Sequence, residues 1–287
     1  MSDATGLRLR FGAGAAGVER LEASLVGESF APHRHDTYAI GITLAGVQSF
    51  RYRGERRYCM PGEAHVLHPD EVHDGTAGTA EGFRYRIVYL DPGLVREALG
   101  DGPLPFVPDP VIGRRAVPSA LVGYLRGIDD PIGELERVEL AADLAGMLAG
   151  HASPSTVTRR SLPLAALRNV RELIDDDPAV LHPTSRYEEV SGLDRWAVAR
   201  QFRAAYGTSP SRYRTMRQLA RARGLIVAGR SLAEAAASAG FADQSHLGRM
   251  FKRAYGLTPA RWAAGVASGS APGESAQSFK TAGRGRR

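Results

Sequence analysis

Three histidines in the first third of the chain have the types and spacing of a ligand-binding or metal-binding set. His33 and His35 are two residues apart, so both side chains point to one face of an extended strand, and His73 could join them from a later strand. Three imidazoles can hold Zn²⁺ or Fe²⁺ and leave coordination positions open. The same rings could instead line a small-molecule pocket, or be hydrogen-bonded as structural residues.

The pocket is the interpretation that we favour, because binding pockets are mostly apolar and carry a few convergent polar groups. We expect no bound metal and no cofactor. Arg34 alternates away from its flanking histidines, which indicates a surface position. The candidate effector-binding residues are His33, His35, Tyr38, Gln48, Tyr52, His73 and Arg86.

A second set of functional candidates lies near the C-terminus, in a stretch that is written twice. The segment from Phe202 to Tyr213 recurs 49 residues later, from Phe251 to Trp262. Both copies read Phe, a cation, any residue, Ala-Tyr-Gly, any residue, a hydroxyl residue, Pro, any residue, Arg and an aromatic. Two copies at a fixed period indicate one supersecondary unit used twice.

Each copy has the pattern of a helix end that follows a shorter helix. Its Phe and Tyr are four residues apart on one helix face, and a glycine suited to a left-handed cap comes next (Gly207, Gly256). Upstream, Ser185-Arg186-Tyr187-Glu188 and Ser231-Leu232-Ala233-Glu234 each read as a capping box. A short helix, a glycine turn and a second helix make a helix-turn-helix, whose second helix lies in the major groove of DNA.

Residues 163–264 resemble the paired helix-turn-helix domain of the AraC/XylS transcription regulators. The most specific run is AGFADQSHL at 239–247, followed by Phe251-Lys252-Arg253. The runs 32–35, 60–63 and 68–73 resemble the cupin-like sensor domain that precedes this domain in many such regulators. Metal-binding cupins carry a Glu a few residues after their His-x-His pair, but Tyr38-Ala39-Ile40-Gly41 occupies that stretch here.

The second helix of each unit, here called the reading helix, buries its apolar face and turns the opposite face to DNA. Arg, Gln and Trp suit guanine edges, adenine edges and thymine methyl groups respectively. We predict base contacts from Arg195, Trp196, Arg200, Gln244, Ser245, His246 and Arg249, and phosphate contacts from Arg203, Lys252 and Arg253. The resemblance places the family's base-contacting positions on Trp196, Arg200, Gln244, Ser245 and Arg249, and puts Ala199 where the family often has a polar residue.

Charge divides the chain into two unlike halves. Residues 159–287 hold 22 Lys and Arg against 10 Asp and Glu, whereas residues 1–158 hold 15 against 21. The basic excess coincides with the repeat, which indicates a polyanion partner for the C-terminal half alone.

We expect an α+β multidomain protein, with an N-terminal cupin-like β-barrel or jelly roll with flanking helices and an all-α C-terminal domain with two helix-turn-helix units. Strands are predicted at 21–26, 38–44, 47–53, 56–59, 64–67 and 83–90, with a tight hairpin at Arg53–Arg56. Helices are predicted at 116–128, 132–149, 162–175 and 210–228. The expected domains are residues 1–150 (the sensor half), a flexible linker at 151–161, the DNA-binding domain at 162–266 and a disordered basic tail at 267–287.

These features predict a sequence-specific DNA-binding transcription regulator, controlled by a small molecule in the sensor half, and not an enzyme. The alternatives are a metal-dependent cupin enzyme that carries DNA-binding helices, and an effector-free architectural DNA-binding protein. The single cysteine, Cys59, rules out an internal disulfide, and no apolar run approaches membrane-spanning length, so a cytoplasmic location is expected.

The expected partners are double-stranded DNA, an unidentified effector and, if the protein activates, RNA polymerase. By resemblance, the helices at 116–149 could pair two copies into a homodimer. Because of the charge break and the linker, we expect residues 160–287 to fold and bind DNA alone.

Overall fold

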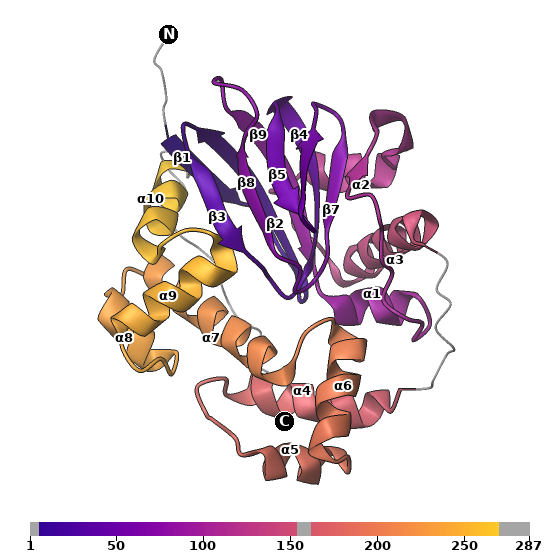
Figure 1. Cartoon of the computed structure of the whole chain (residues 1–287), viewed down its shortest axis with the longest axis vertical. Coiled ribbons are helices and arrows are strands. Elements are labelled where there is room, and N and C mark those ends of the chain that lie inside the picture. The colour runs from indigo at the N-terminus through magenta and orange to yellow at the C-terminus, as the bar shows by residue number, and fades with distance from the viewer. Residues whose placement is uncertain (1–5, 154–161, 270–287) are drawn as a thin grey trace.

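The computed structural model describes residues 6–153 and 162–269, and it places a two-sheet sandwich beside a set of helices that wrap around it (Figure 1). The N-terminal half contains the sandwich, and the described residues of the C-terminal half are helical apart from their connecting turns. The predicted fold class is therefore confirmed.

All strand pairs in the two sheets are antiparallel. The larger sheet has the order β1 (Gly6–Phe11), β2 (Val18–Val26), β9 (Phe83–Leu90), β4 (Tyr38–Gly46), β7 (Ala64–Leu67) and β10 (Val111–Ile112). The smaller sheet has the order β3 (Ser29–His33), β8 (His73–Ala77), β5 (Gln48–Tyr52) and β6 (Glu55–Cys59).

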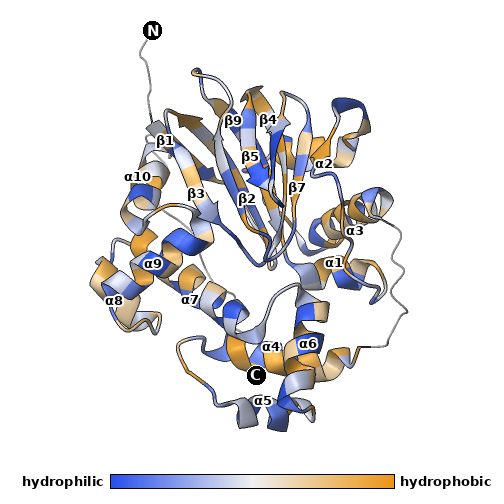
Figure 2. Cartoon of the chain, viewed as in Figure 1, coloured by the Kyte–Doolittle hydropathy of each residue, from blue (hydrophilic) through white to orange (hydrophobic). Residues whose placement is uncertain are grey.

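Alternation along the strands divides the apolar residues of this half between two cores. On β4, Ile40 and Ile42 belong to the core beneath the helices, whereas Ala39 belongs to the core between the sheets. The helices of the first core are α1 (Pro92–Ala98), α2 (Ser119–Arg126) and α3 (Glu134–His151), and a short 3₁₀ turn, η1, covers Arg114–Ala116. Figure 2 shows the resulting interleaving of hydrophobic and hydrophilic residues.

The strand predictions hold, but four strands were missed. The predicted strands at 64–67 and 83–90 have the observed bounds, and the other four overlap β2, β4, β5 and β6. The hairpin turn is confirmed: Arg53 and Gly54 have φ of 51° and 86°, which is a two-residue turn with both residues left-handed. The sequence patterns did not reveal β1, β3, β8 and β10, nor the helix α1.

The C-terminal half contains seven helices among its described residues. They are α4 (Leu164–Asp176), α5 (Thr184–Ser191), α6 (Arg195–Tyr206), α7 (Pro210–Val227), α8 (Leu232–Ser238), α9 (Gln244–Tyr255) and α10 (Pro259–Gly269). We call α5–α6 the first unit and α8–α9 the second unit; α6 and α9 are the reading helices. Helix α10 was not predicted and extends three residues into the segment expected to be a tail; residues 154–161 of the expected linker and 270–287 of the tail lie outside the described residues.

One of the two predicted capping boxes is present. Ser231 accepts the backbone N–H of Glu234 at 3.2 Å, and the Glu234 carboxylate accepts the Ser231 N–H at 2.9 Å. The box predicted at Ser185 is wrong, because α5 begins at Thr184, directly after Pro183, so that Ser185 lies inside the helix and the helix has no side-chain cap.

The two units differ in how they are buried. The first unit packs with α4 and α7 around its own core, which includes Phe202, Val170 and Tyr213. The core of the second unit is continuous with the core between the sheets, and α10 packs along β1. A Cβ added to Gly265 of α10 would lie 3.3 Å from Cγ of Leu9, so the glycine permits this close approach. An isolated fragment of residues 160–287 would therefore expose apolar surface of its second unit.

No helix in the described parts of the chain is long and apolar enough to cross a membrane.

We expect Leu9→Ala to destabilise the second unit although Leu9 lies in the sensor half. The side chain is 2% exposed, and truncating a buried Leu costs about 2–5 kcal/mol. Denaturant unfolding should show that loss, and amide hydrogen exchange should accelerate in α10. Leu181→Ala, at a residue that is 77% exposed, should change stability by less than about 0.5 kcal/mol. Unchanged exchange in α10 of the Leu9 variant would contradict the shared core.

Candidate functional site

The first reading helix is positioned by a tight turn and an N-cap. Gly192 ends α5 in the left-handed region, with φ of 67°. Asp194 then caps α6 by accepting the backbone N–H of Trp196 at 2.9 Å and of Ala197 at 3.0 Å. The helix buries Val198, Phe202 and Tyr206, as predicted, and this burial sets which face remains open.

The second reading helix repeats this construction. Gly240 turns the chain with φ of 79°, and Asp243 caps α9 by accepting the N–H of His246 at 2.6 Å. Leu247 and Phe251 are fully buried on its inner face. Both reading helices end at the predicted left-handed glycines, Gly207 and Gly256, with φ of 72° and 70°.

The outer face of each reading helix carries a stripe of three equivalent positions. In the first unit it consists of Trp196, Arg200 and Arg203, which are four and three residues apart and so share one face. The equivalents 49 residues later are Ser245, Arg249 and Lys252. Trp196 is 71% exposed, and the other five residues are exposed too. Within the described residues, Arg200 and Arg249 have no ion-pair partner, so both guanidinium groups are available.

Two of the predicted base-contacting residues have partners within the protein. The Arg195 guanidinium pairs with Glu188 of α5 at 3.1 Å, and its backbone N–H donates to the same carboxylate. The ring of His246 packs edge-on against Phe241, with centroids 5.4 Å apart. Gln244 remains exposed at the start of α9, where a base edge could meet it.

The three predicted histidines do gather, where β3 meets β8. His33 and His73 pair directly across the two strands, and their ring centroids are 4.3 Å apart. The ring of His35 is 4.8 Å from that of His73. The Nδ1 atoms of His33, His35 and His73 each lie within 3.0 Å of a backbone carbonyl oxygen, that of Ala31, Thr37 and Glu71 respectively. Since a carbonyl only accepts, each Nδ1 carries the proton and each Nε2 is left as an acceptor.

Burial keeps these histidines neutral. It lowers the pKa of His33 to about 4 and, with the neighbouring His33 ring, that of His35 to about 3. Burial, followed by the other two rings, also holds the pKa of His73 well below its usual value. Among the residues that the structure describes, no group of three or more His, Cys, Asp or Glu is placed to hold a metal ion.

The other predicted effector residues do not all share this place. Tyr52 lies beside His73 across β5 and β8, and Gln48 is buried on the same strand. Tyr38 faces the helices instead, and its hydroxyl donates to the Pro105 carbonyl at 2.8 Å. Arg86 also faces the helices. It pairs with Glu22 at 2.6 Å and donates to the carbonyls of Leu125 and Arg126, so it anchors the end of α2.

Two family models match the chain, one in each half. A model of the AraC-like ligand binding domain matches residues 15–145, and a helix-turn-helix domain model matches residues 188–265. The two ranges together span more than two thirds of the 287 residues. The chain belongs to the AraC/XylS family of transcription regulators.

Relatives and solved structures agree with this assignment. An uncharacterized HTH-type transcriptional regulator of Bacillus subtilis, YbfI, is 26% identical over 225 residues, which are 77% of this chain and 82% of the relative. The structure of an apo form of a ToxT variant from Vibrio cholerae has a TM-score of 0.62 at 11% identity, and covers 88% of this chain and 99% of its own. A second ToxT structure, which holds an unsaturated fatty acid, has a TM-score of 0.59 at 11% identity over 91% and 95% of the two chains. At this identity the likeness shows a shared fold.

The sequence reasoning missed two buried histidines of the ligand-binding half. His68 is held on both sides: Nδ1 lies 2.5 Å from the Tyr52 hydroxyl, and Nε2 accepts the N–H of Val107 at 2.9 Å. His65 is fully buried, and neither ring nitrogen has a hydrogen-bond partner among the described residues. A Cβ at Gly41 would lie 2.7 Å from its Nε2, so glycine makes room for this ring. Neither histidine has a spacing pattern that would have marked it.

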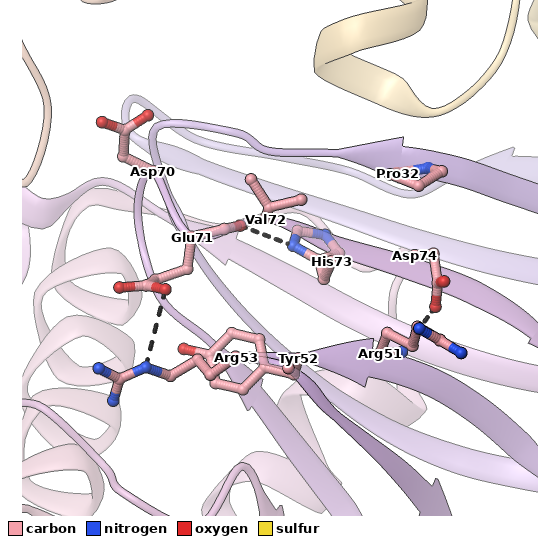
Figure 3. A pocket seen from close by; sticks show the side chains of 10 residues that line it. Pro32, Arg51, Tyr52, Arg53, Asp70, Glu71, Val72, His73 and Asp74 are labelled. Atoms are coloured by element: carbon pink, nitrogen blue, oxygen red, sulfur yellow. Dashed lines mark hydrogen bonds and ion pairs between the residues drawn. The ribbon is translucent and has the colours of Figure 1, made fainter.

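A shallow depression of about 390 Å³ opens beside the group formed by His33, His35 and His73, between the β5–β6 turn and the loop before β8 (Figure 3). Tyr52 and His73 are the two predicted effector residues that line it. The Arg53 guanidinium lies 3.9 Å from the Glu71 carboxylate across its mouth. The depression joins a partly apolar surface, formed by Pro32 and Val72, to charged groups.

We expect acid to destabilise the protein through the histidine cluster. In the unfolded chain these imidazoles titrate near pH 6.5, but in the folded chain those of His33 and His35 titrate only near pH 4 and pH 3, so the unfolded state binds more protons between these values. Above about pH 6.5 the contribution of these histidines to the free energy of unfolding should not change with pH. As the pH is lowered toward 4, the free energy of unfolding should fall. Each unit of pKa difference corresponds to about 1.4 kcal/mol.

Urea unfolding across this pH range would measure the effect, and His35→Gln should flatten the profile. The matched control is His182→Gln, in the segment between α4 and α5. An equal slope in wild type and the His35 variant would contradict the assignment.

Proposed function

We propose that this protein is a sequence-specific transcription regulator that reads DNA with two helices and responds to a small molecule in its N-terminal half. The observation that carries the proposal is the repeated stripe, whose central residue in both units is an exposed arginine with no ion pair among the described residues (Arg200, Arg249). Because one helix, α7, joins the units, both reading helices can enter successive major grooves on one DNA face, about 10–10.5 bp apart. Arg203, Lys252 and Arg253 then lie where backbone phosphates pass.

Footprinting of DNA upstream of its own coding region would test the reading geometry. Two protected tracts, one helical turn apart, are expected. Arg200→Ala and Arg249→Ala should each cost about 1–3 kcal/mol of binding and relax the preference at one base position. Arg115→Ala, at an exposed arginine of the sensor half, should leave both unchanged. A single protected tract would argue against two reading helices.

The match to a ligand-binding domain supports control by a small molecule. ToxT from Vibrio cholerae has been solved with an unsaturated fatty acid bound, which supports binding of a small molecule by this fold. The depression at Tyr52 and His73 is the site that we assign to the effector. This role needs no chemical step, so we infer a regulator without enzymatic activity, located in the cytoplasm where it meets DNA. RNA polymerase is a further partner if the protein activates transcription.

We propose that two copies pair through α3. The helix packs on its own half through Leu140, Leu144 and Leu148, which are buried. A second stripe faces solvent, in which Leu135 is 70% and Val138 is 51% exposed. This stripe continues through Ala142 to Gly146, both exposed, and these small residues would allow a second copy of the helix to approach.

Val138→Asp should convert a dimer to a monomer, because it places a charge in the middle of that stripe. Sedimentation equilibrium measures the outcome directly. Val180→Asp, at an exposed residue of the other half, is the control and should remain dimeric. The α3 interface is excluded if the Val138 variant associates as the wild type does.

A further inference from the structure

The sensor half docks on the same feature of both units. Each reading helix ends at a left-handed glycine, and each of these glycines abuts the sensor half. A Cβ on Gly207 would lie 2.8 Å from Cβ of Pro69, and a Cβ on Gly256 would lie 2.8 Å from the Ala31 carbonyl oxygen. In Figure 1, α6 and α9 accordingly approach the sandwich at two separate places.

An arginine five residues after each glycine completes the docking. Arg212 pairs with Asp70, at 2.7 Å from Nε to Oδ1, and its repeat equivalent Arg261 pairs with Glu28. Because the two arginines occupy the same position of the repeat, the pairs are equivalent docking contacts.

One contact breaks this symmetry. Asp70 also forms an ion pair with Arg203, the last residue of the first unit's outer stripe. The equivalent residue of the second unit, Lys252, is exposed and has no ion pair among the described residues. The second unit therefore docks without a counterpart of the Arg203–Asp70 pair.

We propose that Arg203 is a DNA-phosphate site that Asp70 occupies in this structure, so that the outer stripe of the first reading helix is blocked at its last position while that of the second is open. This inference rests on the proposed DNA-binding function. Arg203 shares its face with Trp196 and Arg200, so a duplex that lies along that face must meet the loop that carries Asp70. A carboxylate and a phosphate present the same kind of anionic oxygens to a guanidinium group, and one can replace the other.

The surroundings of Asp70 suit a restraint that an effector can release. The Asp70 side chain is 7% exposed and held by Arg212 and Arg34, the latter at 3.5 Å, whereas that of Arg203 is 59% exposed. The Arg203 end of the pair is exposed to solvent, where salt screens its charge. Asp70 has a φ of 63°, and its loop forms one wall of the depression assigned to the effector (Figure 3). An occupant of that depression would touch the loop that holds Arg203.

The salt dependence of DNA binding tests the proposal, because each phosphate contact adds about one unit to the slope of log K against log salt. The full chain and a mixed-sequence duplex suffice. Lys252→Ala should lower the slope by about one unit, whereas Arg203→Ala should leave it unchanged. Asp70→Asn should raise the slope by about one unit, and adding Arg203→Ala to it should remove that gain.

Glu28→Gln is the matched control, because it removes a docking carboxylate and one negative charge but touches no outer stripe. It should leave the slope as in wild type, and circular dichroism would confirm that each variant is folded. The inference is overturned if Asp70→Asn leaves the slope unchanged, or if Arg203→Ala lowers it in the wild-type background as Lys252→Ala does. Absence of any duplex binding by the wild type would instead overturn the proposed function.

Discussion

The arrangement of this protein depends on ion pairs between an acidic N-terminal half and a basic C-terminal half. Arg217 of α7 pairs with Asp36 at 2.8 Å, and Arg171 of α4 pairs with Asp91 at 2.7 Å. Both carboxylates are largely removed from solvent. Loss of one partner from such a pair leaves a poorly solvated charge, which is far more costly than loss of a surface pair. These contacts hold the two units against the sandwich.

This interface changes the meaning of the charge break in the sequence. By itself, the excess of arginine predicts an outside polyanion for the C-terminal half alone. Part of that excess is neutralised by the protein's own carboxylates, and the surplus on the stripes remains for DNA. Acidic residues of the sensor half can therefore weaken DNA binding without contacting the DNA, since they compete with it for the same arginines.

The features that sequence reasoning found are local ones. The repeat predicted both reading helices, because caps, helical periodicity and glycine turns all act within a few residues. It could not find β3 and β8, which are short and rich in Pro, His and Gly (Pro32, His33, Gly75). Tyr38 and Arg86 were assigned to the histidine site, but strand alternation turns them toward the helices. Asp70 has no sequence signal as a docking residue, because Arg203 and Arg212, its partners in the C-terminal half, are more than a hundred residues away in the chain.

The sensor half contacts both units, so it can govern the distance and angle between the two reading helices. An effector can change DNA binding only if it binds one docked arrangement more tightly than another. Equal affinity for both arrangements would leave their populations unchanged. The docking contacts at Gly207 and Gly256 provide two points at which such a preference can act. This makes the interface, rather than the sandwich interior alone, the element that connects ligand and DNA.

The two halves form one fixed arrangement in the free protein. The most direct test of this arrangement is the distance distribution between spin labels on cysteines placed at Glu81 and Ser185, both exposed, with Cys59 replaced by serine. Pulsed electron resonance should give one narrow distribution at low salt, which persists as the salt concentration is raised because buried ion pairs are screened little. A broad distribution at low salt, as for two domains on a tether, would contradict the account.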